Sequence, residues 1–253
     1  MRKLMLIGLT LLFVLSFTGF AVGAADREIQ TPEVKKMMDA GDVLVVYPLS
    51  RIEYNDLHIK GSVHIPVPKL AEQLPQDKNK KLIFYCLGRK WKATPKAAGT
   101  AVKLGYKNVY AYRDGLPAWV KAGYPTESIE RLPKVDIPQV TGQELKNMMD
   151  GKENFVMVDI RKGINADKFW IVYPNKILTS LDGLTEAMQG VPNSEKVVVV
   201  DAVGKRSNVA ARYLHLKGYK TVSRLSGGVD QWAKDGFPVG RPWNKLSLMM
   251  KKE

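Results

Sequence analysis

Cysteine is almost absent from this chain: Cys86 is the only one among 253 residues. A single thiol excludes an internal disulfide and any metal site built from several cysteines. Only three histidines are present, and we predict neither a bound metal nor a cofactor. The chain is long enough for one large domain or two of ordinary size, and its core needs no covalent cross-link.

Long apolar runs are also absent, with one exception at the start of the chain. Arg2 and Lys3 precede the mostly apolar residues 4–22, and small residues at 22–24 lie before Ala25. This order is typical of a secretory signal peptide, so we predict cleavage after residue 24 and a periplasmic or secreted protein. The alternative is an uncleaved membrane anchor, because the run approaches the length that spans a bilayer.

Acidic residues are in the minority: 25 Asp and Glu stand against 39 Lys and Arg, which gives a formal net charge of +14. This balance favours anionic partners, such as small oxyanions, acidic proteins or lipid headgroups. The lysines are scattered along the chain and are not interleaved with aromatic residues. We therefore do not expect binding to nucleic acid, nor to a membrane beyond an uncleaved anchor.

A repeat divides the chain into two similar halves. The segment Gly105 to Val109 reads Gly-Tyr-Lys-Asn-Val, and Gly218 to Val222 reads Gly-Tyr-Lys-Thr-Val, 113 positions later (218 − 105). Four further residues recur at the same offset: Gly115, Trp119, Gly123 and Pro125 match Gly228, Trp232, Gly236 and Pro238. A period of this length indicates a duplicated domain. The repetition of the two tryptophans, in a half with a thiol and a half without, indicates core positions.

The repeated units alternate strand-like and helix-like segments. In the first half we expect helices over 31–40, 93–104 and 116–122, and strands over 43–46, 82–85 and 109–112. In the second half we expect helices over 141–149 and 207–217, and strands over 155–158 and 197–200. Nearly continuous apolar strands separated by helices predict an α/β fold with a parallel sheet covered on both faces.

The predicted domain boundaries follow from this division. They are a signal peptide over 1–24, a first domain over 25–126, a linker over 127–137, a second domain over 138–240 and a basic tail over 241–253.

Cys86 directly follows a strand-like run, Leu82 to Tyr85. It opens a short loop made of Leu87, Gly88, Arg89, Lys90, Trp91 and Lys92, after which a helix begins. Cations and a helix N-terminus both stabilise a thiolate, so this pattern predicts a nucleophilic cysteine with a substrate-binding loop over residues 87–92. The alternative is a small, buried apolar side chain. The cationic loop favours the nucleophile.

The second half lacks this thiol. Its corresponding strand ends at Val200, and Asp201 stands at the cysteine position. Its loop is also two residues shorter. Because a carboxylate cannot act as a sulfur nucleophile, we predict that the first half is catalytic and the second half structural or binding.

Together these motifs resemble the tandem rhodanese-domain proteins. The resemblance rests on the cysteine loop, on the stretch His58 to Pro66 (His-Ile-Lys-Gly-Ser-Val-His-Ile-Pro), and on the Gly-x-x-x-Trp-x-x-x-Gly-(Tyr or Phe)-Pro ending of both halves. It implies two rhodanese-like domains and a cysteine persulfide chemistry. It also implies a structural role for His58 and His64, while His215, in the middle of an expected helix, is expected either at the surface or in packing.

The chain departs from the family pattern at two places. An Asp-x-Arg motif ends the first core strand of many members; the second half has it at Asp159 and Arg161, but the first half has Tyr47-Pro48-Leu49. In addition, Trp91 stands where the loop arginine of the first half would fall. The resemblance therefore implies the fold of the family, whereas these departures lie in the part of the first half that would bind the substrate.

Three functions remain open. The first is an exported sulfurtransferase that moves sulfane sulfur, through a Cys86 persulfide, from thiosulfate or a similar small anion to cyanide, a thiol or a sulfur-accepting protein. The second is a sulfur carrier, or an oxyanion- or protein-binding module, without turnover. The third is a cysteine phosphatase or arsenate reductase, which is disfavoured because Lys92 stands where that chemistry needs the bidentate contact of an arginine.

Overall fold

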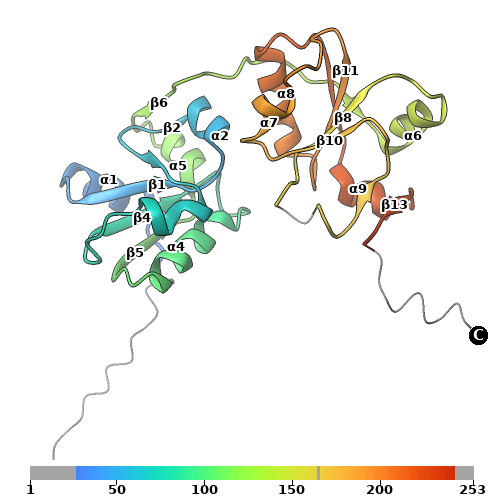
Figure 1. The fold of residues 1–253 in the computed structure, drawn as a ribbon. Coiled ribbons are helices and arrows are strands. Elements are labelled where there is room, and N and C mark those ends of the chain that lie inside the picture. Colours follow the sequence, from blue (N-terminus) through green and yellow to red (C-terminus); the bar gives the residue numbers. More distant parts are fainter. Residues whose placement is uncertain (1–26, 164–165, 243–253) are drawn as a thin grey trace, which may run out of the picture.

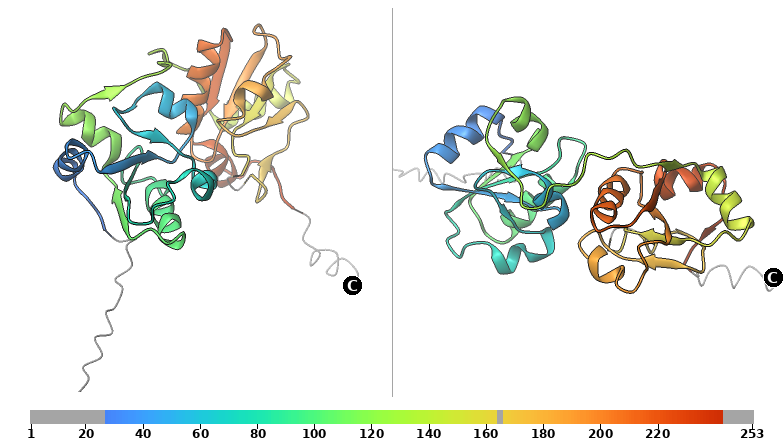
Figure 2. Two further views of the ribbon diagram at one scale, coloured as in Figure 1. Left: turned by 60° about the vertical axis from the view of Figure 1, so that its left-hand side comes forward. Right: turned by 90° about the horizontal axis from the view of Figure 1, so that it is seen from above.

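The structure is a computed structural model that describes residues 27–163 and 166–242. The expected signal peptide and residues 243–253 of the expected tail lie outside this range. Two α/β halves lie side by side, joined by one extended segment that follows β6 (Figures 1 and 2). No helix within the described ranges has the length and apolar character needed to cross a bilayer.

The first half is built on a parallel sheet with strand order β3-β1-β4-β5. Its strands are β1 (Val43–Tyr47), β2 (His58–Ile59), β3 (Val63–His64), β4 (Lys81–Tyr85), β5 (Asn108–Tyr112) and β6 (Thr126–Glu127). Its helices are α1 (Thr31–Asp39), α2 (Arg51–Asp56), η2 (Val67–Lys69), α3 (Leu70–Gln73), α4 (Ala93–Lys103) and α5 (Gly115–Lys121). β2 and β6 form a separate antiparallel pair.

Both faces of this sheet are buried. Ile83 and Tyr85 of β4 pack with α1 and α5 on one face, whereas Leu82 and Phe84 pack with α4 on the other. Alternating side chains of one apolar strand therefore supply two cores, as expected for a parallel sheet covered by helices.

The second half repeats this plan with strand order β10-β8-β11-β12-β7. Its strands are β7 (Gln139–Val140), β8 (Val156–Asp159), β9 (Trp170–Ile171), β10 (Lys176–Leu178), β11 (Lys196–Val200), β12 (Thr221–Leu225) and β13 (Val239–Gly240). Its helices are α6 (Gly142–Asp150), α7 (Leu184–Ala187), α8 (Arg206–Leu216) and α9 (Gly228–Lys234). The predicted pair of parallel-sheet domains is thus confirmed.

The two halves touch through α2 and the connecting segment. Ile52 of α2 is buried in the same apolar cluster as Leu132 and Ile137 of the connection and Leu214 of α8. Arg212 of α8 donates hydrogen bonds to main-chain carbonyls of the connection, at 2.8 and 3.1 Å. The second half therefore uses part of the first half to complete its own core.

The long predicted elements are confirmed to within about two residues at each end, but the sequence analysis missed several short ones. The missed elements include α2, β3, β10 and α7, each of six residues or fewer. So few residues carry too little periodicity to be detected. The missed helix α2 nevertheless begins with a capping box, in which Ser50 and Glu53 bond each other's main-chain N–H groups.

The expected core positions of the two tryptophans are confirmed, and the structure gives the surroundings of the three histidines. Trp119 and Trp232 are each 1% exposed, and each indole donates a hydrogen bond at 2.9 Å, to the carbonyl of Pro125 and of Pro238 respectively. His58 is buried and stacks on Tyr54, and the ring of His64 donates to the carbonyl of Leu49 at 2.9 Å. His215 is exposed on α8.

Candidate functional site

Cys86 directly follows β4, a central strand of the first sheet, at the sheet's carboxyl edge. Its carbonyl accepts a hydrogen bond from the N–H of Leu116 at 2.8 Å. The neighbouring Gly115 has φ +62°, and a Cβ there would lie 2.1 Å from the same carbonyl. Only glycine allows the start of α5 to approach the chain this closely, so the main chain at Cys86 is held firmly in place.

The thiol of Cys86 is fully buried. It belongs to an apolar cluster that includes Tyr47, Tyr54, Tyr85, Tyr112 and Trp119, and the partly buried Leu87 and Trp91 pack against this cluster. The nearest polar contact of Sγ is long, 3.9 Å to the carbonyl oxygen of Gly88. A reagent therefore reaches the sulfur only if residues 87–92 move.

The cations of the first loop face away from the thiol. Arg89 pairs with Glu28 and Asp114, while Lys90 and Lys92 are exposed. The N–H of Trp91 donates to the carbonyl of Gly88 at 3.1 Å. Within residues 27–163, no loop N–H donates to Sγ. Among the described residues, the loop cations expected to stabilise the thiolate thus do not contact the sulfur, because carboxylates outside the loop hold Arg89 and the two lysines are exposed.

The loop of the second half has the arrangement that the first half lacks. The Asp201 carboxylate accepts hydrogen bonds from the N–H groups of Gly204 at 2.6 Å, Arg206 at 2.6 Å and Ser207 at 3.2 Å. Asp201 is only 4% exposed. The loop over residues 201–207 is therefore an anion-binding turn whose anion is its own side chain.

The two loops are otherwise equivalent in position. The N–H of Val229 donates to the carbonyl of Asp201 at 2.9 Å, as that of Leu116 does to Cys86. Leu116 and Val229 are 113 positions apart, whereas Cys86 and Asp201 are 115 apart because the first loop is two residues longer. At the helix starts, Ala93 of α4 corresponds to Arg206 of α8. Counted from the helix start, the first-half position that corresponds to Arg206 is Ala93, whereas counted from Cys86 it is Trp91. The two extra residues lie before the helix and shift the register.

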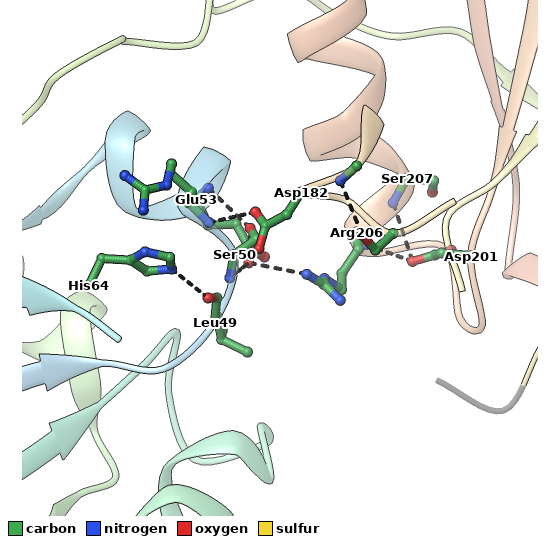
Figure 3. Close-up of polar contacts among 11 residues, drawn as sticks. Leu49, Ser50, Glu53, His64, Asp182, Asp201, Arg206 and Ser207 are labelled. Carbon is green, nitrogen blue, oxygen red and sulfur yellow. Dashed lines mark hydrogen bonds and ion pairs between the residues drawn. The ribbon is translucent and has the colours of Figure 1, made fainter. Parts of the chain in front are cut away.

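Arg206 is directed at the first half. Its Nη2 lies 3.4 Å from Oε2 of Glu53, whose side chain is 2% exposed (Figure 3). The same oxygen accepts a hydrogen bond from Ser50 Oγ at 2.6 Å. Nearby, Asp182 of the second half accepts one from the N–H of Arg51 at 2.7 Å. Polar contacts thus join the start of α2 to the start of α8 and the segment before α7.

The residues that follow or end β1 and β8, the first core strand of each half, also differ. Asp159 and Arg161 form a bidentate pair, at 2.9 and 2.7 Å, and both are almost fully buried. In the first half the hydroxyl of Tyr47 is buried with no partner among the described residues. Burial raises the pKa of Tyr47 well above its ordinary value, and nearby Glu53 adds to the effect while Arg206 opposes it.

A pocket of about 590 Å³ lies between the halves. Its lining includes Ser50, Ala93 and Lys96 from the first half, and Lys162, Ser180 and Arg206 from the second. The pocket lies at the carboxyl edges of both sheets, and its charged lining residues are the cations Lys96, Lys162 and Arg206 and the anion Asp182. The sequence analysis missed Glu53 and Arg206 as partners because they lie 153 positions apart in the chain.

The comparisons with known proteins fit this geometry. The model of the family described as "Rhodanese-like domain" matches residues 30–122 and again 141–235. A protein named sulfurtransferase from Allochromatium vinosum is 27% identical over 106 residues, which cover 42% of this chain and 97% of the relative. A tRNA uridine(34) hydroxylase from Hamiltonella defensa is 31% identical over 100 residues, which cover 37% of this chain but only 28% of that enzyme.

Solved structures show the same likeness at lower identity. A thiosulfate sulfurtransferase from Pseudomonas aeruginosa matches with a TM-score of 0.43 and 17% identity, covering 86% of this chain and 44% of that one. A rhodanese-like domain from Anabaena matches with a TM-score of 0.38 and 24% identity, covering 44% of this chain and 86% of that one.

Proposed function

Because this chain belongs to the rhodanese-like domain family, with one such domain in each half, we propose that it is a sulfurtransferase that carries sulfur on Cys86. One observation supports this most strongly: the equivalent loop of the second half holds a negative charge at the equivalent strand end, by three N–H groups of the main chain. The loop at this position of the fold is therefore able to bind an anion in the second half, and we propose that the first loop offers N–H groups to the Cys86 thiolate only after it rearranges.

The proposed reaction has two steps. The Cys86 thiolate attacks the sulfane sulfur of thiosulfate, a new S–S bond forms, and sulfite leaves with the electron pair of the broken S–S bond. The enzyme then carries a persulfide anion. Cyanide or an acceptor thiolate attacks the outer sulfur, and the Cys86 thiolate is released. Charge balances in each step, so neither step needs a redox cofactor.

Access to the sulfur requires movement of the first loop. Cys86 has no exposed surface, and Leu87 and Trp91 pack against its cluster. Arg89 ties the loop to Glu28 and Asp114 by ion pairs that are partly exposed. Such exposed pairs contribute little to stability because water screens their charges. We propose that they break when the loop opens to admit the donor.

The test is to incubate the purified protein with thiosulfate and measure its mass, and then to add cyanide and measure thiocyanate. A gain of one sulfur followed by turnover supports the proposal. Cys86→Ser is expected to lose both signals, while Asp201→Ala is expected to retain them. Sulfur transfer that persists in Cys86→Ser would contradict the proposal.

The buried thiol favours one alternative, a sulfur carrier or binding module without turnover. That function predicts the mass gain of one sulfur but no thiocyanate. A cysteine phosphatase or arsenate reductase predicts neither, and instead predicts hydrolysis of a phosphoryl group or reduction of arsenate. The same protein sample therefore separates all three functions.

We also propose export to the periplasm or beyond, on the basis of the charged, apolar and small-residue order of residues 1–24. The measurement is the N-terminal sequence of the protein recovered from the expressing cell. A protein beginning at Ala25 supports cleavage, and one that retains Met1 contradicts it. The proposed partners are a small anionic sulfur donor and a thiol or protein acceptor.

A further inference from the structure

The pocket between the two halves is not used by the sulfur transfer proposed above. Neither Cys86 nor any residue of its loop, 87–92, is among the residues that line it. Its volume is about 590 Å³, which lies within the range typical of sites for small organic ligands, about 300–1,000 Å³. The pocket is therefore large enough for a ligand considerably bigger than a single inorganic oxyanion.

The first half supplies an apolar wall of this pocket. The wall is formed by Pro48 and Leu49, which follow β1, and by Pro66 and Val67 at the start of η2. Proline loses almost no side-chain entropy when a ligand covers it, and burial of apolar surface is favourable by about 25 cal/mol per Å². This wall is suited to the apolar part of an organic molecule.

Cations line the rest of the pocket. They are Lys96 of α4 and, from the second half, Lys162 and Arg206, whereas Asp182 is the one carboxylate of the lining. Within residues 27–163 and 166–242, the only one of these cations in an ion pair is Arg206, whose Nη2 lies 3.4 Å from Oε2 of Glu53. Even with Glu53 counted against Arg206, the lining keeps an excess of positive charge, which favours an anionic ligand.

Arg206 is only partly satisfied by its contact with Glu53. Its Nε is buried and has no hydrogen-bond partner among the described residues. Buried polar atoms are nearly always hydrogen-bonded, so this Nε, on a side chain that lines the pocket, is available to an acceptor on a ligand. Asp182 does not serve as that acceptor, because its Oδ1 accepts the N–H of Arg51 at 2.7 Å (Figure 3).

We propose that this pocket binds a small organic phosphate monoester. Its phosphate group lies beside Lys96, Lys162 and Arg206, and its apolar body lies on the proline-containing wall of the first half. A phosphate monoester carries close to two negative charges at neutral pH, which suits three cations better than a single carboxylate does. Such a ligand contacts both halves, so its binding stabilises their association.

The first measurement separates the two parts of the ligand. The full chain is titrated calorimetrically at about pH 8 and low salt with naphthyl phosphate, with inorganic phosphate and with naphthol. Naphthyl phosphate is expected to bind one molecule per chain, at least about tenfold more tightly than either fragment, because it gains from both walls. Equal affinities for naphthyl phosphate and inorganic phosphate, or no binding of naphthyl phosphate, would overturn the proposal.

The second measurement locates the site. Lys96→Gln and Lys162→Gln are each expected to weaken the binding of naphthyl phosphate by about threefold or more. Both lysines are exposed, so we expect neither substitution to disturb the fold. Lys121→Gln is the matched control, since Lys121 is exposed at the end of α5 and outside the pocket lining. Equal weakening in all three variants would show diffuse attraction to a basic surface and would contradict the assignment.

The apolar wall has its own variant. Val67→Ser is expected to weaken naphthyl phosphate and to leave the affinity for inorganic phosphate unchanged. Thermal unfolding of this variant is measured as well, because Val67 also packs against the core of the first half. Unchanged binding of naphthyl phosphate would show that the wall does not contact the ligand, and the two lysine variants decide the proposal if Val67→Ser folds poorly.

A peptide of six glutamates tests the other kind of occupant. If this peptide binds more tightly than naphthyl phosphate and depends on Lys96 and Lys162, the pocket binds an acidic protein segment and the proposal is overturned. Weaker binding of the peptide supports the small ligand. These titrations contain neither thiosulfate nor cyanide, so a failure of sulfur transfer is distinguishable from a failure of this inference.

Discussion

The loops at residues 86–92 and 201–207 begin at equivalent strand ends, but they surround the first residue of the loop with different groups. The second loop curls around the Asp201 carboxylate and donates three main-chain N–H groups to it. The first loop is longer, faces its cations outward and leaves Cys86 in an apolar cluster. The second loop holds a built-in carboxylate, whereas the first loop holds a buried thiol. The two halves share the strand end and the start of the following helix, and they differ in the length and the N–H directions of the loop between them.

The comparison extends to the first core strands. The second half neutralises its buried charge internally, through Asp159 and Arg161. The first half has Tyr47 at the position of Asp159, and its Glu53 forms an ion pair with Arg206 of the second half. The second half is therefore self-sufficient at this position, and the first half is not.

Arg161→Ala should have the largest effect on stability. It leaves the Asp159 carboxylate buried without its partner, which typically costs about 3–5 kcal/mol. Urea unfolding measures the loss, and the exposed neighbour Lys162→Ala serves as a control with an expected change within about 0.5 kcal/mol. A loss below about 1 kcal/mol for Arg161→Ala would show that the buried pair is not what holds this strand end.

Asp201→Ala should have the next largest effect. The substitution leaves three N–H groups of the loop without an acceptor, and we expect the free energy of unfolding to fall by about 2–4 kcal/mol. Added sulfate is expected to restore part of the loss in this variant by occupying the vacated turn, which a rise in melting temperature would report. Sulfate should stabilise Cys86→Ala far less, because the first loop offers the sulfur no N–H groups. Equal responses of the two variants would break the contrast between the loops.

Arg89→Ala should change reactivity more than stability. Removing the ion pairs to Glu28 and Asp114 is expected to cost little stability, since their charges are exposed to water. The released loop should expose Cys86 more often, so its rate of reaction with a disulfide reagent is expected to rise by about fivefold at most, which is the effect that such weak pairs can have on an opening equilibrium. Lys90→Ala is the matched control from the same loop. An unchanged rate in Arg89→Ala would show that these pairs do not hold the loop closed.

His64 provides the smallest expected effect, and it concerns pH. Burial lowers the pKa of His64 below its ordinary value of 6.5, so the folded state binds its proton less readily than the unfolded state. The stability contributed by neutral His64 is therefore complete above about pH 6.5 and is lost as pH falls through this value. His64→Asn should flatten the fall in melting temperature between about pH 6.5 and 5. The exposed His215→Asn should not, and an equal change in both variants would contradict the assignment.

The sequence predicted the fold where apolar runs are long. The β4 and β11 strands, and the helices α4 and α8 that follow them, carry clear periodicity and glycine or proline boundaries, and the repeat doubles each signal. The short strands β3 and β10 have two and three residues and no such signal.

The candidate site was predicted only in part. The position of Cys86 after a strand follows from local sequence, but the path of its loop depends on Glu28 and Asp114, which lie 61 and 25 positions from Arg89. The Glu53 and Arg206 pair depends on how two domains meet. Such contacts are set by tertiary packing, and one sequence holds no local pattern for them.

The central claim is that Cys86 carries sulfur while the equivalent position of the second half does not. The most direct measurement is peptide-level mass spectrometry of the Arg89→Ala protein, whose loop is expected to be open, after incubation with thiosulfate. The account predicts one added sulfur atom, located on the peptide that contains Cys86. An unmodified Cys86 peptide, in a protein whose thiol reacts freely with a disulfide reagent, would contradict it.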